Sequence, residues 1–270
     1  MKKHISTIIL ILIFLVGLSV LLYPAVSDWW NTKVQTRAIV DYDNALSNMN
    51  ETDYESEFAA ADAYNASLRE ISMPFINYSE VSGYDDILNV TGNGMIGYIT
   101  IDKINVKLPI YHGTSESILN VAVGNLPGSS LPVGGESTHS VLSAHRGLPS
   151  AKLFSDLDKL KERDTFTITV LNRLLTYEVD HISIVEPDKI EDLYIEEGKD
   201  YCTLLTCTPY GINTHRLLVR GHRVENADDG AAVLTNDAYE LDSLILAPVV
   251  AAPLLLILLI IVLVKYRKKK

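Results

Sequence analysis

The feature that most constrains this chain is a long apolar run at each end. Ile5 to Leu22 is 18 residues without a charge, and Leu244 to Val264 is 21 residues without a charge. Each run is long enough to cross a hydrocarbon core of about 30 Å as a helix rising about 1.5 Å per residue. We therefore predict a membrane-spanning helix at each end, and a water-soluble fold must be built from the residues between them.

Basic residues beside the two runs predict their orientation. Lys2 and Lys3 precede the first run, and KYRKKK follows the second. Cationic flanks favour the cytoplasmic side, so both termini are predicted to be cytoplasmic and the intervening segment extracellular. The first run also fits a cleaved signal peptide. We favour an uncleaved anchor, because the run exceeds the usual length of a signal peptide's apolar region and LYPAVSDWW contains no clean cleavage site.

The segment between the two runs is strongly acidic. All 34 acidic residues lie there with 16 of the 23 basic residues, so its net charge is −18. This charge argues against nucleic acid as a partner, because phosphates bind basic surfaces.

The two cysteines, Cys202 and Cys207, lie in one strand-like run. In a strand, residues five positions apart point to opposite faces and lie about 16 Å apart at about 3.3 Å per residue. A disulfide needs Cα atoms within about 7 Å. Alternation places Cys202 with Leu204 on one face, which predicts a buried thiol, and Cys207 with Leu205 on the other, at the exit of the strand.

Periodicity separates a helical part from a strand-rich part. Apolar residues recur at helical spacing over residues 33–70, with a break near Asn48 to Thr52. From Gly97 the pattern alternates, as in GYITIDKINVKLPIY and TYEVDHISIV, while LFSDLDKLKE (Leu153 to Glu162) predicts a short amphipathic helix. Short strands, Gly- and Pro-rich turns and few helices favour a mainly β fold, a closed or nearly closed barrel.

Two residues are candidate partners for the Cys207 thiol. Arg216 opens the next strand-like run, RLLVRG, and lies beside Cys207 if the two runs pair as neighbours. A guanidinium there can stabilise an oxyanion, although spacing alone equally allows a surface arginine. A thiol nucleophile also needs a proton partner, most often histidine. Of the six histidines after the first apolar run, His145 has the best context, because the strand SVL leads into its Gly- and Pro-containing loop.

These residues resemble those of the sortases, membrane-anchored cysteine transpeptidases of Gram-positive bacteria. TLLTC (Thr203 to Cys207) matches the family's Thr-Leu-x-Thr-Cys signature. LPIYHGT, SLPVGGESTHSVLSAHRGLPSAKLF and TLLTCTPYGINTHRLLVRG are similar to class C, the pilus-assembling sortases. The resemblance covers roughly Gly92 to Val224 and extends to the layout with two anchors.

The resemblance implies a closed sortase β-barrel of about eight strands, preceded by helices and flanked by a transmembrane helix at each end. It implies that Cys207 is the nucleophile, His145 the general acid/base and Arg216 the group that stabilises substrate and oxyanion. Thr206 would be a supporting residue that positions substrate. No metal or organic cofactor is needed for this chemistry.

The implied reaction is cleavage of a Leu-Pro-x-Thr-Gly-like sorting signal between Thr and Gly, through a thioacyl-enzyme. The partners would be pilin or surface proteins that carry this signal, and a pilin lysine amine would resolve the intermediate as an isopeptide bond. One alternative is a housekeeping sortase that attaches surface proteins to the peptidoglycan precursor. Another is a catalytically silent, membrane-tethered surface scaffold.

One stretch departs from the class C pattern. These enzymes often carry a lid whose Asp-Pro-aromatic motif pairs with the catalytic arginine and covers the cysteine, and here Met73, Pro74 and Phe75 stand at that place. A methionine cannot form the ion pair. We therefore expect either a lid that is held more loosely, with Phe75 over Cys207, or an ordinary connecting loop.

The pattern and the resemblance together predict six segments. They are an N-terminal anchor or signal segment (1–27), a helical stalk with the lid loop (28–91), the catalytic barrel (92–226), an acidic linker (227–243), a C-terminal transmembrane helix (244–264) and a basic cytoplasmic tail (265–270).

Overall fold

The computed structural model describes residues 2–226, 251–253, 255–257, 259–261 and 264. The chain divides into two compact units. The terminal unit comprises Met1–Asn31, Pro149–Ala151 and Ala232–Lys270, and the barrel unit comprises Thr32–Leu148 and Lys152–Ala231. The predicted linker (227–243) and basic tail (265–270) lie outside the described residues.

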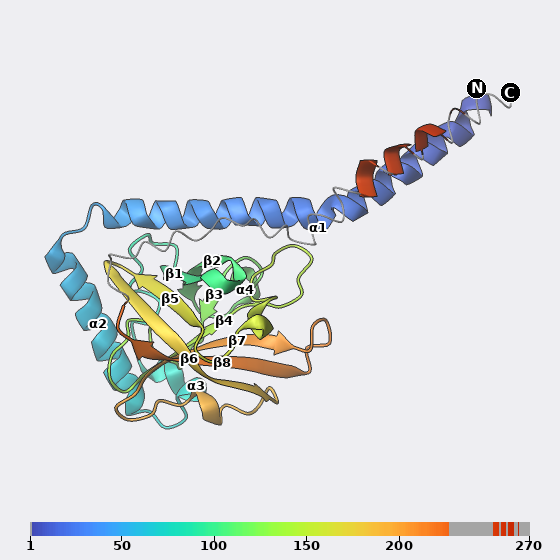
Figure 1. Ribbon diagram of the computed structural model, residues 1–270. Coiled ribbons are helices and arrows are strands. Elements are labelled where there is room, and N and C mark those ends of the chain that lie inside the picture. The colour runs from blue at the N-terminus through green and yellow to red at the C-terminus, as the bar shows by residue number, and fades with distance from the viewer. Residues whose placement is uncertain (1, 227–250, 254, 258, 262–263, 265–270) are drawn as a thin grey trace. The chain divides into compact units, whose positions relative to one another are not determined.

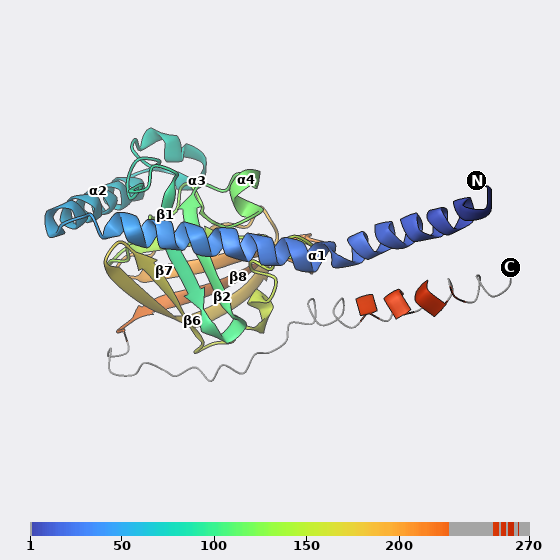
Figure 2. The same cartoon turned by 90° about the horizontal axis from the view of Figure 1, so that it is seen from above.

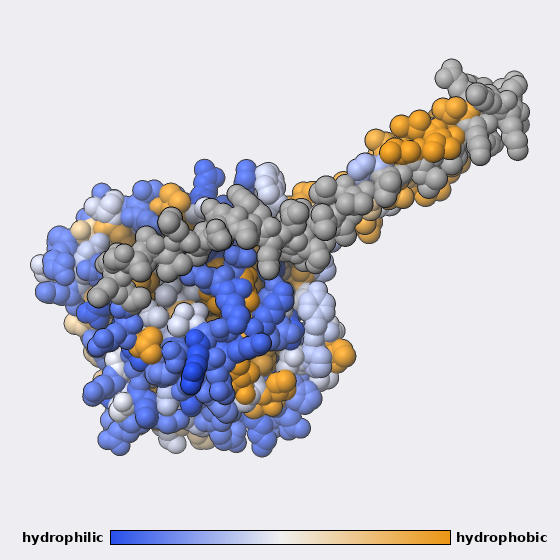
Figure 3. Space-filling model, viewed as in Figure 1, coloured by the Kyte–Doolittle hydropathy of each residue, from blue (hydrophilic) through white to orange (hydrophobic). Residues whose placement is uncertain are grey.

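The terminal unit contains most of the apolar part of helix α1 (Lys2–Leu46). Within α1, Thr7–Leu46 is the one helix in the described ranges that is long and apolar enough to cross a membrane. Its large apolar side chains, such as Ile13 and Val20, are exposed, and hydrophobic residues gather on the described helical segments of this unit (Figure 3). Of the predicted C-terminal helix, 244–264, the described residues 251–253, 255–257, 259–261 and 264 are helical, and the others are not described.

The barrel unit is built on a closed β-barrel, which confirms the predicted fold class (Figure 1). The strand order is β1-β2-β3-β4-β7-β8-β6-β5, and β5 pairs with β1 to close the barrel. The pairs β2–β3 and β4–β7 are parallel, whereas the other pairs are antiparallel. The strands are β1 (Met95–Ile101), β2 (Val106–His112), β3 (Val123–Asn125), β4 (Thr138–Ser143), β5 (Thr165–Val170), β6 (Arg173–Val185), β7 (Asp200–Thr208) and β8 (His215–Val224).

Two helices precede the barrel, as the helical spacing of residues 33–70 predicts. The part of α1 from Thr32 onward crosses over β1 and β2 (Figure 2), and α2 (Glu51–Arg69) follows a short turn. Tyr42 fastens α1 to the barrel, because its hydroxyl donates to the Ile96 carbonyl at 2.7 Å and accepts from the Leu171 N–H at 2.9 Å. Asn50 caps α2 through a reciprocal capping box with Asp53.

Short helices lie in the connections between these elements. They are α3 (Pro74–Asn77), α4 (Glu116–Leu119) and four single 3₁₀ turns at Tyr78–Glu80, Asp102–Ile104, Leu157–Lys159 and Glu191–Leu193.

The helix predicted for Leu153 to Glu162 is wrong, because only Leu157–Lys159 forms a 3₁₀ turn there. Leu153, Leu157 and Leu160 recur at helical spacing, but all three are buried against the barrel from a folded loop. Leu153 has a φ of 42°, which an α-helix does not allow. Burial of these three leucines outweighs the local helical preference, which for so short a segment is weak.

Candidate active site

Cys207 and Arg216 are directly opposed in the antiparallel ladder between β7 and β8. Directly opposed residues point to the same face of a sheet and lie within about 5.5 Å at their Cα atoms. The two strand-like runs therefore pair as neighbours, which is the condition under which the sequence places Arg216 beside Cys207. Both side chains are half-buried.

Cys202 lies on the other face of β7. Its side chain is fully buried, as is that of Leu204, and burial raises the pKa of the Cys202 thiol well above its usual range. A buried neutral thiol is inert, because the thiolate is the nucleophilic form. The alternation argument that separates the two cysteines is confirmed by this placement, and neither cysteine forms a disulfide.

The position of His145 depends on the parallel pairing of β4 with β7, in which Ser143 is opposite Leu205. Beyond the end of β4, the Ala144 N–H donates to the Leu205 carbonyl at 3.2 Å, and the Ala144 carbonyl accepts from the Thr206 hydroxyl at 2.7 Å. These two bonds fasten the residue before His145 to the residues before Cys207. Thr206 itself is 1% exposed, so its hydroxyl serves the backbone of β4 rather than the solvent.

Arg146 ties the loop after His145 to the residue after Cys207. Its guanidinium donates to the Thr208 hydroxyl at 3.1 Å and to the Ser155 carbonyl at 3.2 Å, and it pairs with the Asp158 carboxylate. The Arg146 side chain is only 8% exposed. This residue was not among the sequence candidates; the signal that could have found it is its place directly after His145.

Cys207, His145 and Arg216 line one pocket of about 420 Å³. Its volume is within the range of small-ligand sites, and both apolar and polar groups face it. The other residues that line it are Phe75, Thr114, Leu119, Leu126, Pro127, Ser143, Ala144, Val185, Pro187, Lys189, Ile190, Leu193, Leu205, Thr206 and Leu218.

The Arg216 guanidinium has no acidic partner among the described residues. It donates to the backbone carbonyls of Asn213 at 3.3 Å and His215 at 3.1 Å. Carbonyl contacts hold the side chain without neutralising its charge, so the pocket contains an uncompensated cation. Such a cation can stabilise negative charge that develops on a bound group.

Of Met73, Pro74 and Phe75, only Phe75 lines this pocket. The Phe75 side chain packs against the buried cluster of Val141, Leu193 and Leu218, and its ring lies 5.6 Å from the Tyr194 ring, measured between centroids. Met73 is 53% exposed and does not line the pocket. The segment therefore contacts the pocket through its aromatic ring and has no ion pair with Arg216.

Gly128 allows this segment to approach the barrel closely. A Cβ atom at Gly128 would lie 2.6 Å from the Pro74 carbonyl oxygen and 2.7 Å from the Phe75 Cα. The backbone of Gly128 also has a φ of 90°, which favours glycine.

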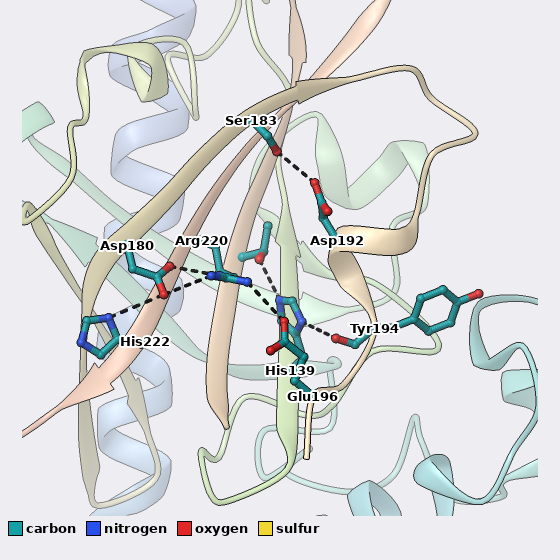
Figure 4. A network of polar contacts seen from close by, with 9 residues as sticks. His139, Asp180, Ser183, Asp192, Tyr194, Glu196, Arg220 and His222 are labelled. Carbon is teal, nitrogen blue, oxygen red and sulfur yellow. Dashed lines mark hydrogen bonds and ion pairs between the residues drawn. The ribbon is translucent and has the colours of Figure 1, made fainter. Parts of the chain in front are cut away.

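The wall of the pocket beside Phe75 comes from the connection between β6 and β7, residues 186–199, here called the β6–β7 loop. Pro187, Lys189, Ile190 and Leu193 of this loop line the pocket. Sequence reasoning missed these residues, because nothing in their spacing indicates that a long loop folds back over the barrel. Figure 4 shows the polar side chains that hold the loop.

No cluster of three or more residues suited to bind a metal occurs in the described part of the chain. The polar groups that line the pocket include a thiol, an imidazole and a guanidinium, and these three together can support nucleophilic catalysis.

Comparison with known proteins gives one consistent family. Residues 99–224 match the sortase domain model. A crystal structure of sortase C1 from Streptococcus agalactiae is 52% identical, with a TM-score of 0.65 over 71% of this chain and 100% of that chain. A sortase C from Streptococcus pneumoniae, described with reference to pilin substrate specificity, is 49% identical, with a TM-score of 0.63 over 70% and 97% of the two chains.

A third solved structure contains a ligand motif. It is a Clostridium perfringens sortase C with the C-terminal cell wall sorting motif, 45% identical to this chain, with a TM-score of 0.61 over 71% of this chain and 100% of that chain. The domain match, the closed eight-stranded barrel and these identities all agree with the resemblance seen in the motifs. The chain therefore belongs to the sortase family, as a class C sortase and a cysteine transpeptidase.

Proposed function

We propose that this sortase cleaves a Leu-Pro-x-Thr-Gly-like sorting signal and joins pilin subunits through isopeptide bonds. The observation that carries the proposal is the shared pocket, in which Cys207 and Arg216 are register partners and His145 is fastened beside them. The similarity to pilin-related sortase C enzymes, one of them solved with a sorting motif, supports the choice of substrate.

In the first half of the reaction, the Cys207 thiolate attacks the threonine carbonyl of the signal. The carbonyl oxygen becomes an oxyanion, and the Arg216 guanidinium donates hydrogen bonds to it. The bond between threonine and glycine then breaks as the His145 imidazolium gives a proton to the departing glycine amine. A thioester between Cys207 and the pilin remains.

In the second half, a lysine amine from another pilin attacks the thioester. His145 takes the proton from the incoming amine, the carbon–sulfur bond breaks, and Cys207 leaves as the thiolate. The new bond is an isopeptide, so the net reaction exchanges one amide for another and needs no external energy source. Thr206 supports both halves by holding the backbone before His145 through its bond to the Ala144 carbonyl.

We further propose that residues 72–80 act as a lid. Phe75 lines the pocket, and its ring is held by apolar and aromatic contacts in place of the ion pair that Met73 cannot form. A substrate signal must displace this ring to reach Cys207, so opening of the lid precedes binding.

The chain acts at the cell membrane in this proposal. The apolar helix within Thr7–Leu46 is the N-terminal anchor, and the barrel lies outside the cell, where secreted pilins arrive. Both termini are cytoplasmic by the distribution of basic residues.

The test is a cleavage and polymerisation assay with a sorting-signal peptide and a reconstituted pilin. Cys207→Ala should abolish both reactions, whereas Cys202→Ala should retain most of the activity because that thiol is buried away from the pocket. Equal loss in both variants, or cleavage without any pilin polymer, would contradict the proposal.

A further inference from the structure

We propose that His139 is a positioning residue that fixes where the β6–β7 loop lies against the barrel and so shapes the substrate pocket. Through Tyr194, it also supports Phe75. This inference rests on the proposed function, because the pocket concerned is the one that would bind the sorting signal. His139 does not line the pocket, and it acts through the loop.

At the end of the β6–β7 loop, the Thr138 N–H donates to the Lys199 carbonyl at 3.0 Å and the Gly198 N–H donates to the Ser137 hydroxyl at 2.9 Å. Three contacts made by barrel side chains hold residues 192–196 of the loop (Figure 4). The Ser183 hydroxyl on β6 donates to Asp192 at 3.3 Å. The Arg220 guanidinium on β8 contacts Glu196 at 3.4 Å and pairs with Asp180 at 3.0 Å. These first two contacts are long and exposed, so each contributes little.

The third contact is the buried one. His139 on β4 is 1% exposed, and its Nδ1–H donates to the Tyr194 carbonyl at 2.9 Å. Its Nε2 lies 2.7 Å from the hydroxyl of Thr203, a β7 residue that is also 1% exposed. The carbonyl can only accept, so Nδ1 carries the proton and Nε2 accepts from Thr203. The imidazole thus joins two strands of the barrel to one peptide group of the loop.

Burial favours the neutral imidazole at this position. It lowers the pKa of His139, and the nearby Arg220 charge acts in the same direction, while the bond to Tyr194 opposes them. The neutral form with its proton on Nδ1 satisfies both hydrogen bonds, with Thr203 as the donor to Nε2.

The carbonyl that His139 holds belongs to the residue next to a wall residue of the pocket. Leu193, directly before Tyr194, lines the pocket and is 3% exposed in a cluster with Val141 and Leu218. The Tyr194 ring contacts Phe75 with 5.6 Å between ring centroids. A shift of the Tyr194 carbonyl therefore moves a wall residue of the pocket and a support of the lid together.

Two substitutions at His139 separate this role from simple packing. An asparagine side chain carries its amide nitrogen at the same number of bonds from the backbone as Nδ1, whereas glutamine matches Nε2. His139→Asn can therefore keep the bond to Tyr194, while His139→Gln keeps the contact with Thr203 and leaves the Tyr194 carbonyl without its donor.

The first measurement is the rate at which iodoacetamide alkylates Cys207. It is made in a Cys202→Ala background, so that Cys207 is the single thiol that can react. His139→Gln should react about tenfold faster than the parent, because an unpaired buried carbonyl destabilises the closed arrangement on that scale. His139→Asn should stay near the parent rate. His222→Gln is the matched control, because His222 contacts Asp180 of the same network at 3.8 Å but does not touch the loop.

The second measurement is the KM for a sorting-signal peptide. It is made in a Phe75→Ala background, so that opening of the lid does not contribute to the measured KM and only the effect of the pocket wall is seen. His139→Gln should raise KM about tenfold with kcat within about twofold, because the wall contributes to binding rather than to the chemical step. His139→Asn should restore most of the binding. A purely structural role would instead lower the fraction of active enzyme and the melting temperature without changing KM.

The outcomes are distinguishable. If His139→Gln and His139→Asn are folded and both match the parent in alkylation rate and KM, the inference is overturned. If the parent cleaves no sorting peptide, the proposed function fails, while the alkylation rates still decide the role of His139. If His139→Gln does not fold, Tyr194→Ala is measured instead, because the Tyr194 side chain is 37% exposed and can be removed without loss of the fold. An unchanged alkylation rate of Cys207 in Tyr194→Ala overturns the link from the loop to the lid.

Discussion

The two sides of the pocket are built in different ways. On one side, Cys207 and Arg216 are opposed in an antiparallel ladder, and His145 follows a strand that pairs with the same β7. On the other side, Phe75 and Leu193 lie on a four-residue helix and a long loop. The ladder is cooperative, so it holds Cys207 and Arg216 rigidly, whereas the loop side depends on a few separate contacts and is easier to move.

The difference suggests a division of labour between chemistry and access. Changes on the strand side should lower the rate of the chemical step, and changes on the loop side should alter how readily the pocket is reached. The following predictions test this division, from the largest expected effect to the smallest.

Arg216→Lys should have the largest effect. Lysine keeps the charge but lacks the planar fork of donors, so kcat for peptide cleavage should fall about 10²- to 10³-fold, the scale of removing an oxyanion donor. Steady-state kinetics measure this loss. Arg223→Lys on the same strand is the control, because Arg223 does not line the pocket. If kcat for Arg216→Lys stays close to that of the parent, the strand side of the pocket does not control the chemical step.

Arg146→Met should have the next effect. It removes the bonds that tie the loop after His145 to Thr208, so His145 should shift relative to Cys207 and kcat/KM should fall by about tenfold or more. The pH profile of kcat/KM should also change, because it reports the ionisation of the acid and base groups. Lys103→Met, which breaks an exposed ion pair with Asp164 elsewhere, should leave both unchanged. An unaltered profile in Arg146→Met would show that the loop needs no such tie.

Phe75→Ala should have a smaller effect, on access alone. An aromatic contact contributes about 1 kcal/mol, so its loss should raise the alkylation rate of Cys207 roughly fivefold. Ile76→Ala is the matched control in the same short helix, since Ile76 is 66% exposed and does not line the pocket. Equal rates in the two variants would mean that residues 72–80 are an ordinary connecting loop.

The smallest effect concerns stability at acidic pH. Burial lowers the pKa of His112 and His139 below the ordinary value of 6.5, so the unfolded chain binds more protons than the folded chain as the pH falls below about 6.5. The free energy of unfolding should therefore decrease from pH 6.5 downward and level off below the folded-state pKa values. Urea unfolding at several pH values measures this decrease.

A variant separates this contribution from others. His139→Asn removes one of the two titrating groups, so its loss of stability on acidification should be smaller than that of the parent. The exposed His181, changed to Gln, should leave the decrease as it is. A decrease of the same size in His139→Asn and the parent would assign the effect to other residues.

Much of the pocket's strand side could be predicted from local pattern. Alternation separates Cys202 from Cys207, and the short turn between β7 and β8 brings Arg216 back to Cys207 because adjacent antiparallel strands pair through such turns. The break between α1 and α2 also follows from spacing. These features depend on residues that are near one another in the chain.

The loop side could not be predicted in this way. His139 and Tyr194 are 55 positions apart, and nothing in either neighbourhood indicates that a histidine on one strand holds a peptide of a distant loop. The expected helix at Leu153 to Glu162 fails for a related reason, because three leucines at helical spacing are buried by the barrel instead of by a helix face.

The sequence by itself determined the apolar N-terminal helix and the strand alternation, because each follows from the period of the side chains. It offered Arg216 as a neighbour of Cys207 only on the condition that the two runs pair, and the structure met that condition. Only the tertiary structure decided that β5 closes on β1, that β4 lies parallel to β7 so that His145 lines the same pocket as Cys207, and that Phe75 contacts the β6–β7 loop. These contacts join residues far apart in the chain, and their free energy comes from burial that exists only once the barrel has closed.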